Sequence, residues 1–165
     1  MTIQIDSREK ARAIKKILET FKDKRVNHHI SKLYVGDYMN LDNPRLIIDR
    51  KQNLTELCSN VCQDHDRFRA EIQRANEAGI QLIFLVEHGQ GITKLDDVEH
   101  WENPRRWKRI KDESTGTYKD VETKAMKGST LYKVLQTMER KYDTKFLFCD
   151  KYETGDMIIT LLDRW

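Results

Sequence analysis

The stretch LIIDRK, residues 46–51, places three charged side chains directly after three apolar ones, and the turn signal GDY at residues 36–38 comes before it. The apolar start predicts a strand, in which successive side chains point to opposite faces of the sheet. Ile47, Asp49 and Lys51 therefore share one face. A carboxylate and an ammonium then lie two residues apart, with the carboxylate of Asp37 on the preceding turn. This set suits the binding of a divalent metal and the activation of water against a phosphate.

Two further acids, Asp6 and Glu9, lie in the segment IDSRE at residues 5–9, at the end of another predicted strand. Acidic groups that converge on one spot repel each other unless a cation is bound. The acids therefore predict a Mg²⁺ or Mn²⁺ site, at which Lys51 orients water or stabilises charge on the phosphate. The alternative is that each acid caps a helix or lies in a turn, and taken singly Asp6 and Glu9 fit this alternative better. It is weaker for Asp37 and Asp49, because a charged pair in a core-like strand has a desolvation cost.

Strand-like and helix-like patterns alternate along the chain. The continuous apolar run QLIFLVE at residues 81–87 is typical of a strand covered on both faces. We expect an α/β fold with a central mixed sheet flanked by helices, in a single domain over residues 1–165. Strands are predicted at 3–6, within 27–35, and at 46–51, 81–87 and 145–149. Helices are predicted around residues 14–21, from 53 to about 78, around 131–138 and over 154–165.

Regularity lapses between about residues 89 and 129, which is longer than a usual connection and predicts an irregular insertion or lid. Its stretch PRRWKRIK at 104–111 combines five cations with a tryptophan, a pattern that suits a surface following DNA phosphates. A solvated charged loop is the alternative. Trp101 and Trp107 are either anchors of a lid, which we favour, or a platform on which bases stack. The residues of this insertion that are expected to contact DNA are Arg105, Arg106, Lys108, Arg109 and Lys111.

Composition narrows the class of protein only slightly. The net charge of +3 does not indicate a partner by itself, although 35% of the residues are charged. No stretch has the apolar length of a membrane-spanning helix, so no membrane partner is expected. Three cysteines without framework spacing favour a reducing, cytoplasmic setting. Cys58, Cys62 and His65 fall on one helical face, but zinc needs a fourth ligand, so buried cysteines are the favoured interpretation.

Three motifs together resemble those of the XPF-type structure-specific endonucleases of the PD-(D/E)XK superfamily: IDSRE at 5–9, VGDY at 35–38 and IDRK at 48–51. The resemblance covers residues 1–88 closely and 130–165 in pattern. It implies a restriction-endonuclease-like fold and a short stand-alone version encoded by a bacterium or phage. The catalytic set that it implies is Asp6, Arg8, Glu9, Asp37, Asp49, Arg50 and Lys51. Of these, the three aspartates would bind the metal and Lys51 would be the catalytic lysine, while Arg67 in the next helix would contact DNA.

The chain departs from the family pattern in three ways. Asp49 replaces the usual glutamate, which shortens the ligand by one methylene. Thr55 stands where the signature has its last aspartate, with Glu56 beside it. The family's helix–hairpin–helix module has no counterpart, so DNA affinity would come from this domain, a homodimer or a separate partner with that module. Apolar stripes on the last two predicted helices, ending at Trp165, are the surface expected for pairing, and covering the sheet is their alternative use.

The function expected from these features is that of a divalent-metal-dependent endodeoxyribonuclease in DNA repair or recombination. It would cut branched or flap-like DNA by attack of water on a phosphodiester. The competing class is a catalytically degenerate DNA-binding or scaffolding subunit of the same fold, against which the presence of Asp6, Asp37, Asp49 and Lys51 argues. A resolvase or a restriction-type nuclease on the same fold is a third option.

Overall fold

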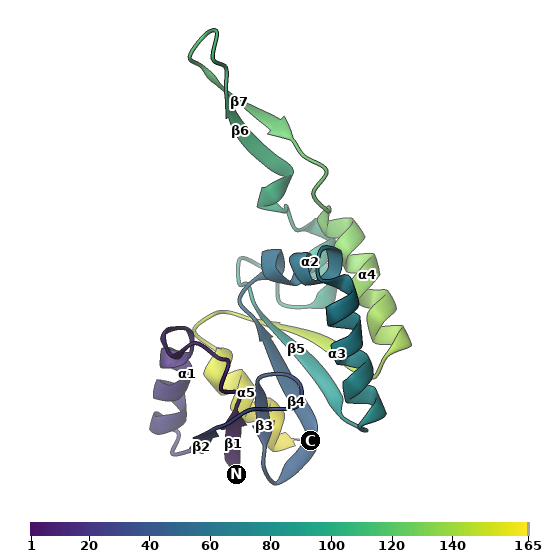
Figure 1. Ribbon diagram of the computed structural model, residues 1–165. Coiled ribbons are helices and arrows are strands. Elements are labelled where there is room, and N and C mark those ends of the chain that lie inside the picture. Colours follow the sequence, from purple (N-terminus) through teal and green to yellow (C-terminus); the bar gives the residue numbers. More distant parts are fainter. Residues whose placement is uncertain (165) are drawn as a thin grey trace.

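The computed structural model describes residues 1–164, so Trp165 lies outside the described part. Its centre is a six-stranded mixed sheet of order β2-β1-β3-β4-β5-β8 with helices on both faces, which is the expected α/β fold (Figure 1). The strands of this sheet are β1 (Thr2–Ile5), β2 (Asn27–Ile30), β3 (Tyr38–Asn40), β4 (Asn43–Lys51), β5 (Gln81–Glu87) and β8 (Thr144–Cys149). The helices are α1 (Ala11–Asp23), α2 (Leu54–Cys62), α3 (His65–Glu77), α4 (Gly128–Lys141) and α5 (Thr154–Arg164), with short 3-10 helices η1 (Leu95–His100) and η2 (Pro104–Arg106). None of the helices in this part of the chain is long and apolar enough to cross a membrane.

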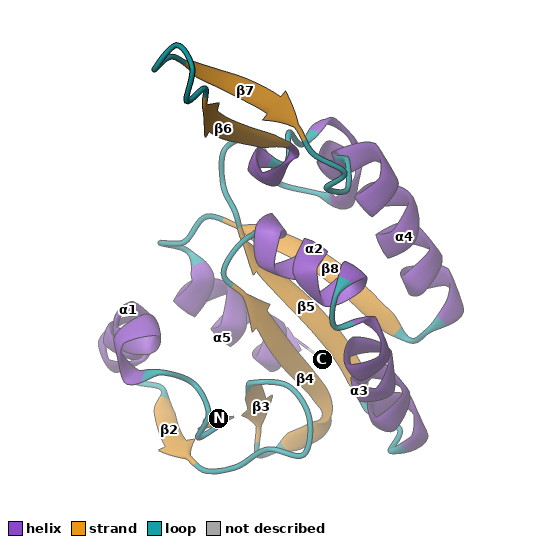
Figure 2. Ribbon diagram, turned by 45° about the horizontal axis from the view of Figure 1, so that its top comes forward, coloured by secondary structure: helices purple, strands orange, loops and turns teal. Residues whose placement is uncertain are grey.

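Two sets of helices enclose the sheet: α2, α3 and α4 pack on one face, and α1 and α5 pack on the other (Figure 2). Apolar residues at helical spacing produce this arrangement, since they bury one stripe of each helix. Helix α4 buries Leu131 and Leu135 in this way, and α5 buries Ile158 and Leu162. The stripes considered for pairing therefore cover the sheet. A homodimer stays a prediction, and the end of its expected surface, Trp165, lies outside the described residues.

Strand β4 has the predicted alternation of faces. Ile47 lies in the core beneath α2, α3 and α4, whereas Ile48 lies in the core beneath α1 and α5. The strand pairs antiparallel with β3 as far as Ile48 and parallel with β5 over 46–51, so its charged C-terminal end is held by β5 and lies just beyond the end of the β3 pairing. The turn before β3 requires glycine at position 36, because φ is +62° and a Cβ would lie 2.6 Å from Ile47 Cγ2. This tight approach brings Asp37 against β4.

The segment from 89 to 129 is not irregular, which corrects the expectation from its sequence. It contains η1, η2 and an antiparallel hairpin of β6 (Trp107–Lys111) and β7 (Tyr118–Glu122) that protrudes from the body (Figure 1). Every residue of these two strands is exposed. Because neither face of the hairpin is buried, its strands need no alternation of apolar and polar residues, which is the pattern that marks a half-buried strand. No periodic pattern in the sequence therefore predicts these two strands.

Candidate active site

The end of β4 and the turn before β3 place Asp37 beside Asp49. The Asp37 N–H donates to the Ile48 carbonyl at 2.8 Å, and its Oδ2 accepts from the Arg50 N–H at 2.8 Å. The Asp49 side chain is nearly fully buried. Backbone pairing of the strands thus brings together the two carboxylates that the sequence predicts as metal ligands.

Lys51 extends along the same face of β4 as Asp49. Its Nζ lies 2.6 Å from Asp49 Oδ1 and 5.7 Å from the ring centres of Phe68 and Phe84. The Lys51 ammonium is the one polar partner that the structure of residues 1–164 gives Asp49 Oδ1. A buried carboxylate oxygen whose one partner is a cation is suited to bind a cation.

Burial and the charges of neighbouring acids raise the pKa of both carboxyl groups. Burial is the largest cause for Asp37, whose pKa lies well above its usual value, and the charges of Asp49 and Glu9 raise it further. Burial also raises the pKa of Asp49 to about 6, although the Lys51 ammonium opposes the shift and Glu71 adds to it. At neutral pH Asp49 therefore stays mostly ionised, and the raised pKa of Asp37 shows that its negative charge is unfavourable there unless a cation is bound.

These shifts predict a pH-dependent stability for the metal-free protein. A carboxyl group whose pKa is raised on folding binds its proton more tightly in the native state, so its stabilising contribution falls as the pH rises through its folded pKa. We expect Asp37→Asn to raise the melting temperature in EDTA at about pH 7.5 by about 2–6 °C, since a shift of one pKa unit is about 1.4 kcal/mol. The gain should vanish near about pH 4, where wild-type Asp37 is already protonated. Calorimetry at both pH values measures it, and an equal gain at both would contradict the assigned repulsion.

Arg50 lies on the other face of β4 and is buried in a network of its own. Its guanidinium donates to Glu9 Oε2 at 2.8 and 3.0 Å and to Glu87 Oε1 at 3.2 Å. Glu9 Oε2 also accepts from the Tyr38 hydroxyl at 3.0 Å. Glu9 and Arg50 are therefore bound to each other, and their geometry supports a role in holding β4 in place beneath Asp37.

Asp6 is fully buried, and its carboxylate is occupied by hydrogen bonds. It accepts from the Arg8 backbone N–H at 2.8 Å, from the Arg8 guanidinium at 2.6 and 3.2 Å, and from the Leu33 N–H at 2.6 Å. Burial raises the pKa of Asp6, but the hydrogen bonds from Arg8 and Leu33 outweigh it, so this pKa lies below its usual value. Metal ligation by Asp6 stays a prediction. The hydrogen bonds indicate instead that Asp6 positions the Arg8 guanidinium, whose pKa is raised by Asp6 and also by the charge of Asp37.

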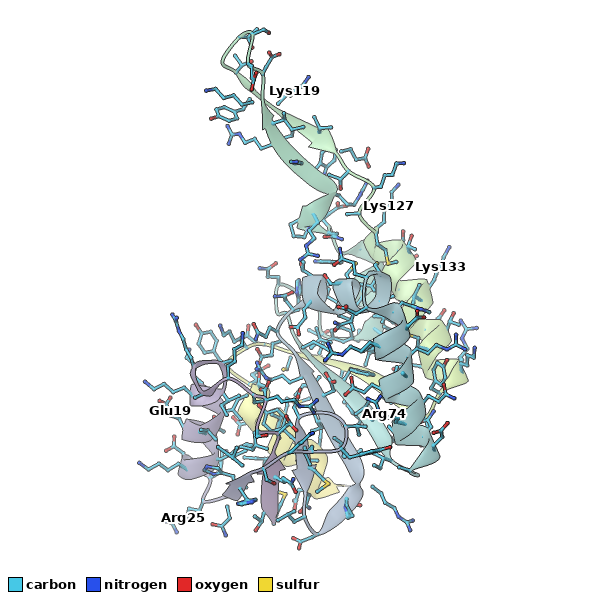
Figure 3. All side chains as sticks on the ribbon, in the orientation of Figure 1. Glu19, Arg25, Arg74, Lys119, Lys127 and Lys133 are labelled. Atoms are coloured by element: carbon cyan, nitrogen blue, oxygen red, sulfur yellow. The ribbon has the colours of Figure 1, made fainter. Side chains whose placement is uncertain are left out.

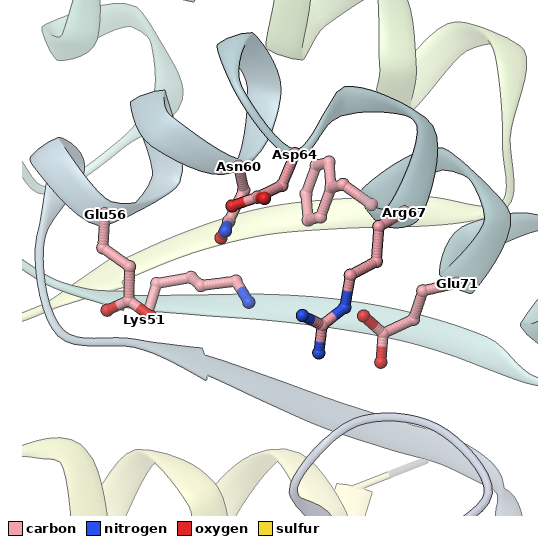
Figure 4. Close-up of a pocket in the computed structure, with 7 residues that line it drawn as sticks. Lys51, Glu56, Asn60, Asp64, Arg67 and Glu71 are labelled. Carbon is pink, nitrogen blue, oxygen red and sulfur yellow. The ribbon is translucent and has the colours of Figure 1, made fainter.

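A polar pocket of about 210 Å³ opens beside the face of β4 that carries Asp49 and Lys51 (Figure 4). In the view of Figure 4, the Arg67 guanidinium lies between the Lys51 ammonium and the Glu71 carboxylate. The predicted position of Arg67 in the helix after the motif thus places it in the pocket. The residues that line the pocket are Lys51, Glu56, Asn60, Asp64, Arg67, Phe68 and Glu71.

Two acids of the site, Glu71 and Glu87, were missed from the sequence, whereas Glu56 was noted there beside Thr55. Glu71 accepts from the Gly36 N–H at 3.3 Å and raises the pKa of Asp49, yet in the sequence it is only one charged residue of a polar helix face. Glu87 ends β5 and binds Arg50, and only its place at the end of a strand would have indicated it. Glu56 lines the pocket and accepts from the Gln52 N–H at 2.8 Å, whereas Thr55 does not line it. The acid beside β4 at this point is therefore Glu56.

The residues of the site fit a hard divalent cation with few protein ligands. Within residues 1–164, no three side chains of His, Cys, Asp and Glu form a group that would hold a metal by themselves. Mg²⁺ is commonly bound by one or two carboxylates together with water and substrate phosphates, so such a group is not required. Asp37 and Asp49 meet this requirement, because their carboxylates lie together in a buried site beside the pocket. Asp6, the third expected ligand, has its carboxylate occupied by Arg8 and Leu33, so its metal ligation stays a prediction.

The five cations expected to contact DNA differ in their surroundings. Arg105 donates to Ser59 Oγ at 2.6 Å, a neutral partner that leaves its charge uncompensated, whereas Arg106 is paired with Glu102 and Glu122. Cross-strand packing brings Glu122 to Arg106, which the sequence did not indicate, and DNA contact by the five cations stays a prediction. The three exposed cations on β6 are Lys108, Arg109 and Lys111.

Two solved structures resemble the chain. XPF from Aeropyrum pernix superposes with a TM-score of 0.65 at 17% sequence identity, covering 98% of this chain and 63% of that one. XPF from Aeropyrum pernix in complex with DNA gives a TM-score of 0.63 at 18% identity, with the same coverage. The chain thus spans less than two thirds of those chains, and the likeness shows the fold. Neither supports the expected bacterial or phage origin.

No curated protein matches the sequence. The ERCC4 domain matches residues 5–161, which is nearly the whole chain. The protein therefore belongs to the ERCC4 domain family and has the α/β fold of the XPF nuclease domain.

Proposed function

We propose that the protein is a divalent-metal-dependent endodeoxyribonuclease that cuts branched or flap-like DNA. One observation carries the proposal: Asp37 and Asp49 lie together with raised pKa values, beside the Lys51 ammonium and next to a polar pocket. Such perturbed groups in a pocket are typical of catalytic sites. ERCC4 domain membership and the DNA complex of XPF from Aeropyrum pernix support DNA as the substrate.

In this proposal Asp37 and Asp49 would hold Mg²⁺ or Mn²⁺, and the bound cation would supply Lewis-acid chemistry toward the phosphodiester. Hydrolysis forms a bond from the water oxygen to phosphorus and breaks one ester P–O bond. One proton of the water passes through solvent to the leaving oxygen, so the strand is left with a phosphate end and a hydroxyl end. Asp49 and the other acids near it give the site a negative charge that a cation neutralises.

Lys51 acts as a cation in this proposal. Burial lowers its pKa, but the carboxylates of Asp49, Asp37 and Glu56 together outweigh burial, so the net shift is upward and the ammonium stays charged at neutral pH. A charged ammonium does not accept the proton of the attacking water; it stabilises the negative charge that develops on the phosphate oxygens. Arg67 supplies a second cation in the same pocket, suited to bind a phosphate oxygen.

The test is a cleavage assay on labelled flap, fork, junction and linear duplex DNA with Mg²⁺ or Mn²⁺, and with EDTA as the control. We expect at least one branched substrate to be cut in one strand near its branch. No substrate should be cut in EDTA. A scaffolding subunit would bind the same substrates without cutting any of them in either metal. Cutting of linear duplex at the same rate as branched DNA would contradict the proposed preference for structure.

A further inference from the structure

The hairpin of residues 107–122 is exposed on both faces. An isolated two-stranded hairpin is only marginally stable in water, so this one depends on its base. There the Thr123 N–H donates to the Arg106 carbonyl at 2.7 Å, and Asn103 Nδ2 donates to the Met126 carbonyl at 2.8 Å. The hairpin is thus fixed at its base and held away from the body. We call the segment of residues 105–127 that carries it the arm. Figure 3 shows Lys119 far from the sheet and Lys127 where the arm rejoins α4.

The arm concentrates the positive charge of the chain. Residues 105–127 hold eight Lys and Arg against four Asp and Glu, a net charge of +4, whereas the whole chain has +3. Arg106 and Glu122 neutralise each other at the base. No ion pair within residues 1–164 involves the cations farther along the strands, which are Lys108, Arg109, Lys111 and Lys119. This charge distribution is complementary to a polyanion.

The strand register divides the hairpin into two different faces. Trp107 pairs with Glu122, Arg109 with Asp120 and Lys111 with Tyr118, so these side chains share one face. We call this the aromatic face, because Trp107 and Tyr118 are 54% and 58% exposed on it. Arg109 Cζ lies 5.0 Å from the centre of the Tyr118 ring. The opposite face carries Lys108, Ile110, Lys119 and Val121.

We propose that the aromatic face binds an unpaired DNA strand, so that the arm holds the single-stranded part of a branched substrate. Exposed rings next to cations are what sequence-tolerant binding of single strands uses. On this face bases would stack on Trp107 and Tyr118, and phosphates would meet Arg109 and Lys111. The acids of the same face are Asp120 and Glu122, of which Glu122 is paired with Arg106. Trp107 and Lys111 are separated by about 13 Å along β6, which is about four nucleotides at the rise of a stacked strand. A duplex offers its base edges to a β-ribbon, but its bases already stack on each other and leave no faces for the rings.

The base of the arm is attached to the helix that also lines the candidate active site. Arg105 Nη1 donates to Ser59 Oγ at 2.6 Å, and Ser59 belongs to α2. Glu56 and Asn60 of the same helix line the pocket beside Lys51. An unpaired strand held on the arm would therefore leave the adjoining duplex close to the pocket. This inference rests on the proposed function only for the identity of the substrate.

The experiment measures binding without cleavage, by fluorescence anisotropy in EDTA. The probes are a labelled oligothymidine of about 15 nucleotides and a duplex of the same length. Trp107→Ala and Tyr118→Ala should each weaken oligothymidine binding by about tenfold, since one stacked base contributes about that factor or more. Duplex binding should change by less than about twofold, because all charges remain. The matched control is Ile110→Ala with Val121→Ala, which removes the exposed apolar residues of the opposite face and should leave both affinities unchanged.

A second measurement detects the stack itself. Oligothymidine should quench the fluorescence of Trp107, and Trp107→Phe should remove the quenching while it keeps most of the affinity. Unchanged oligothymidine binding in the Trp107→Ala Tyr118→Ala variant would overturn the inference, as would an equal loss on single strand and duplex. Light scattering in which this variant loses a dimer but keeps its DNA affinity would assign the face to a second copy of the chain instead. A wild-type protein that cuts no substrate but shows the expected binding would overturn the proposed function alone.

Discussion

Asp49→Asn is expected to lower metal-dependent cleavage of branched DNA at least about 1,000-fold, equivalent to about 4 kcal/mol of lost transition-state stabilisation. The carboxylate is buried beside Asp37, and Lys51 is the one cation that the structure of residues 1–164 pairs with it. Asparagine keeps the shape of the side chain and removes that charge. Single-turnover rates at saturating metal and DNA measure the loss. Asp37→Asn is expected to give a loss of the same order.

The controls separate loss of chemistry from loss of folding. Asp23→Asn removes an exposed carboxylate at the end of α1 and should leave the rate unchanged. Asp49→Asn should also keep its affinity for DNA in EDTA, because substrate contacts are assigned to Arg67 and to the hairpin. A variant that unfolds at the wild-type temperature, binds DNA normally and still cuts within about tenfold of the wild-type rate would show that Asp49 is not a metal ligand.

The positions of Asp49 and Lys51 were predictable because a strand has a period of two residues. Once Leu46, Ile47 and Ile48 are assigned to a buried strand, the face of each following side chain is fixed, and the structure has that arrangement. The same holds for the helices, whose apolar spacing decides which stripe packs on the sheet. These features depend on local periodicity alone.

The rest of the site depends on packing between elements that are distant in the sequence. Glu71 reaches Gly36 only because α3 packs across the sheet, and nothing local distinguishes it from other charged residues of that helix. Glu87 meets Arg50 because β4 and β5 pair in parallel. Arg106 is neutralised by Glu122 because of the register of the hairpin. Each of these contacts is set by tertiary packing, so no spacing in the sequence predicts it.

Arg50 gives the second large expected effect, and it concerns stability. The motif places this arginine between two predicted catalytic residues, yet its guanidinium lies on the opposite face of β4 from Lys51 and binds Glu9 and Glu87. Its side chain is 3% exposed, and that of Glu87 is 5% exposed. Removing one partner of a buried ion pair leaves the other charge without compensation, which typically costs about 3–5 kcal/mol.

Arg50→Met is therefore expected to lower the free energy of unfolding by about 3–5 kcal/mol, measured by chemical denaturation at about pH 7.5. The matched control is Arg69→Met on the exposed surface of α3, where the change should stay within about 0.5 kcal/mol. Adding Glu87→Gln to Arg50→Met should recover part of the loss, since it removes one of the two buried charges left behind. A stability loss below about 1 kcal/mol would contradict the structural role. If instead Arg50→Met folded stably but lost cleavage, the guanidinium would act on the reaction itself, and the separation of β4 into a catalytic face and a supporting face would be wrong.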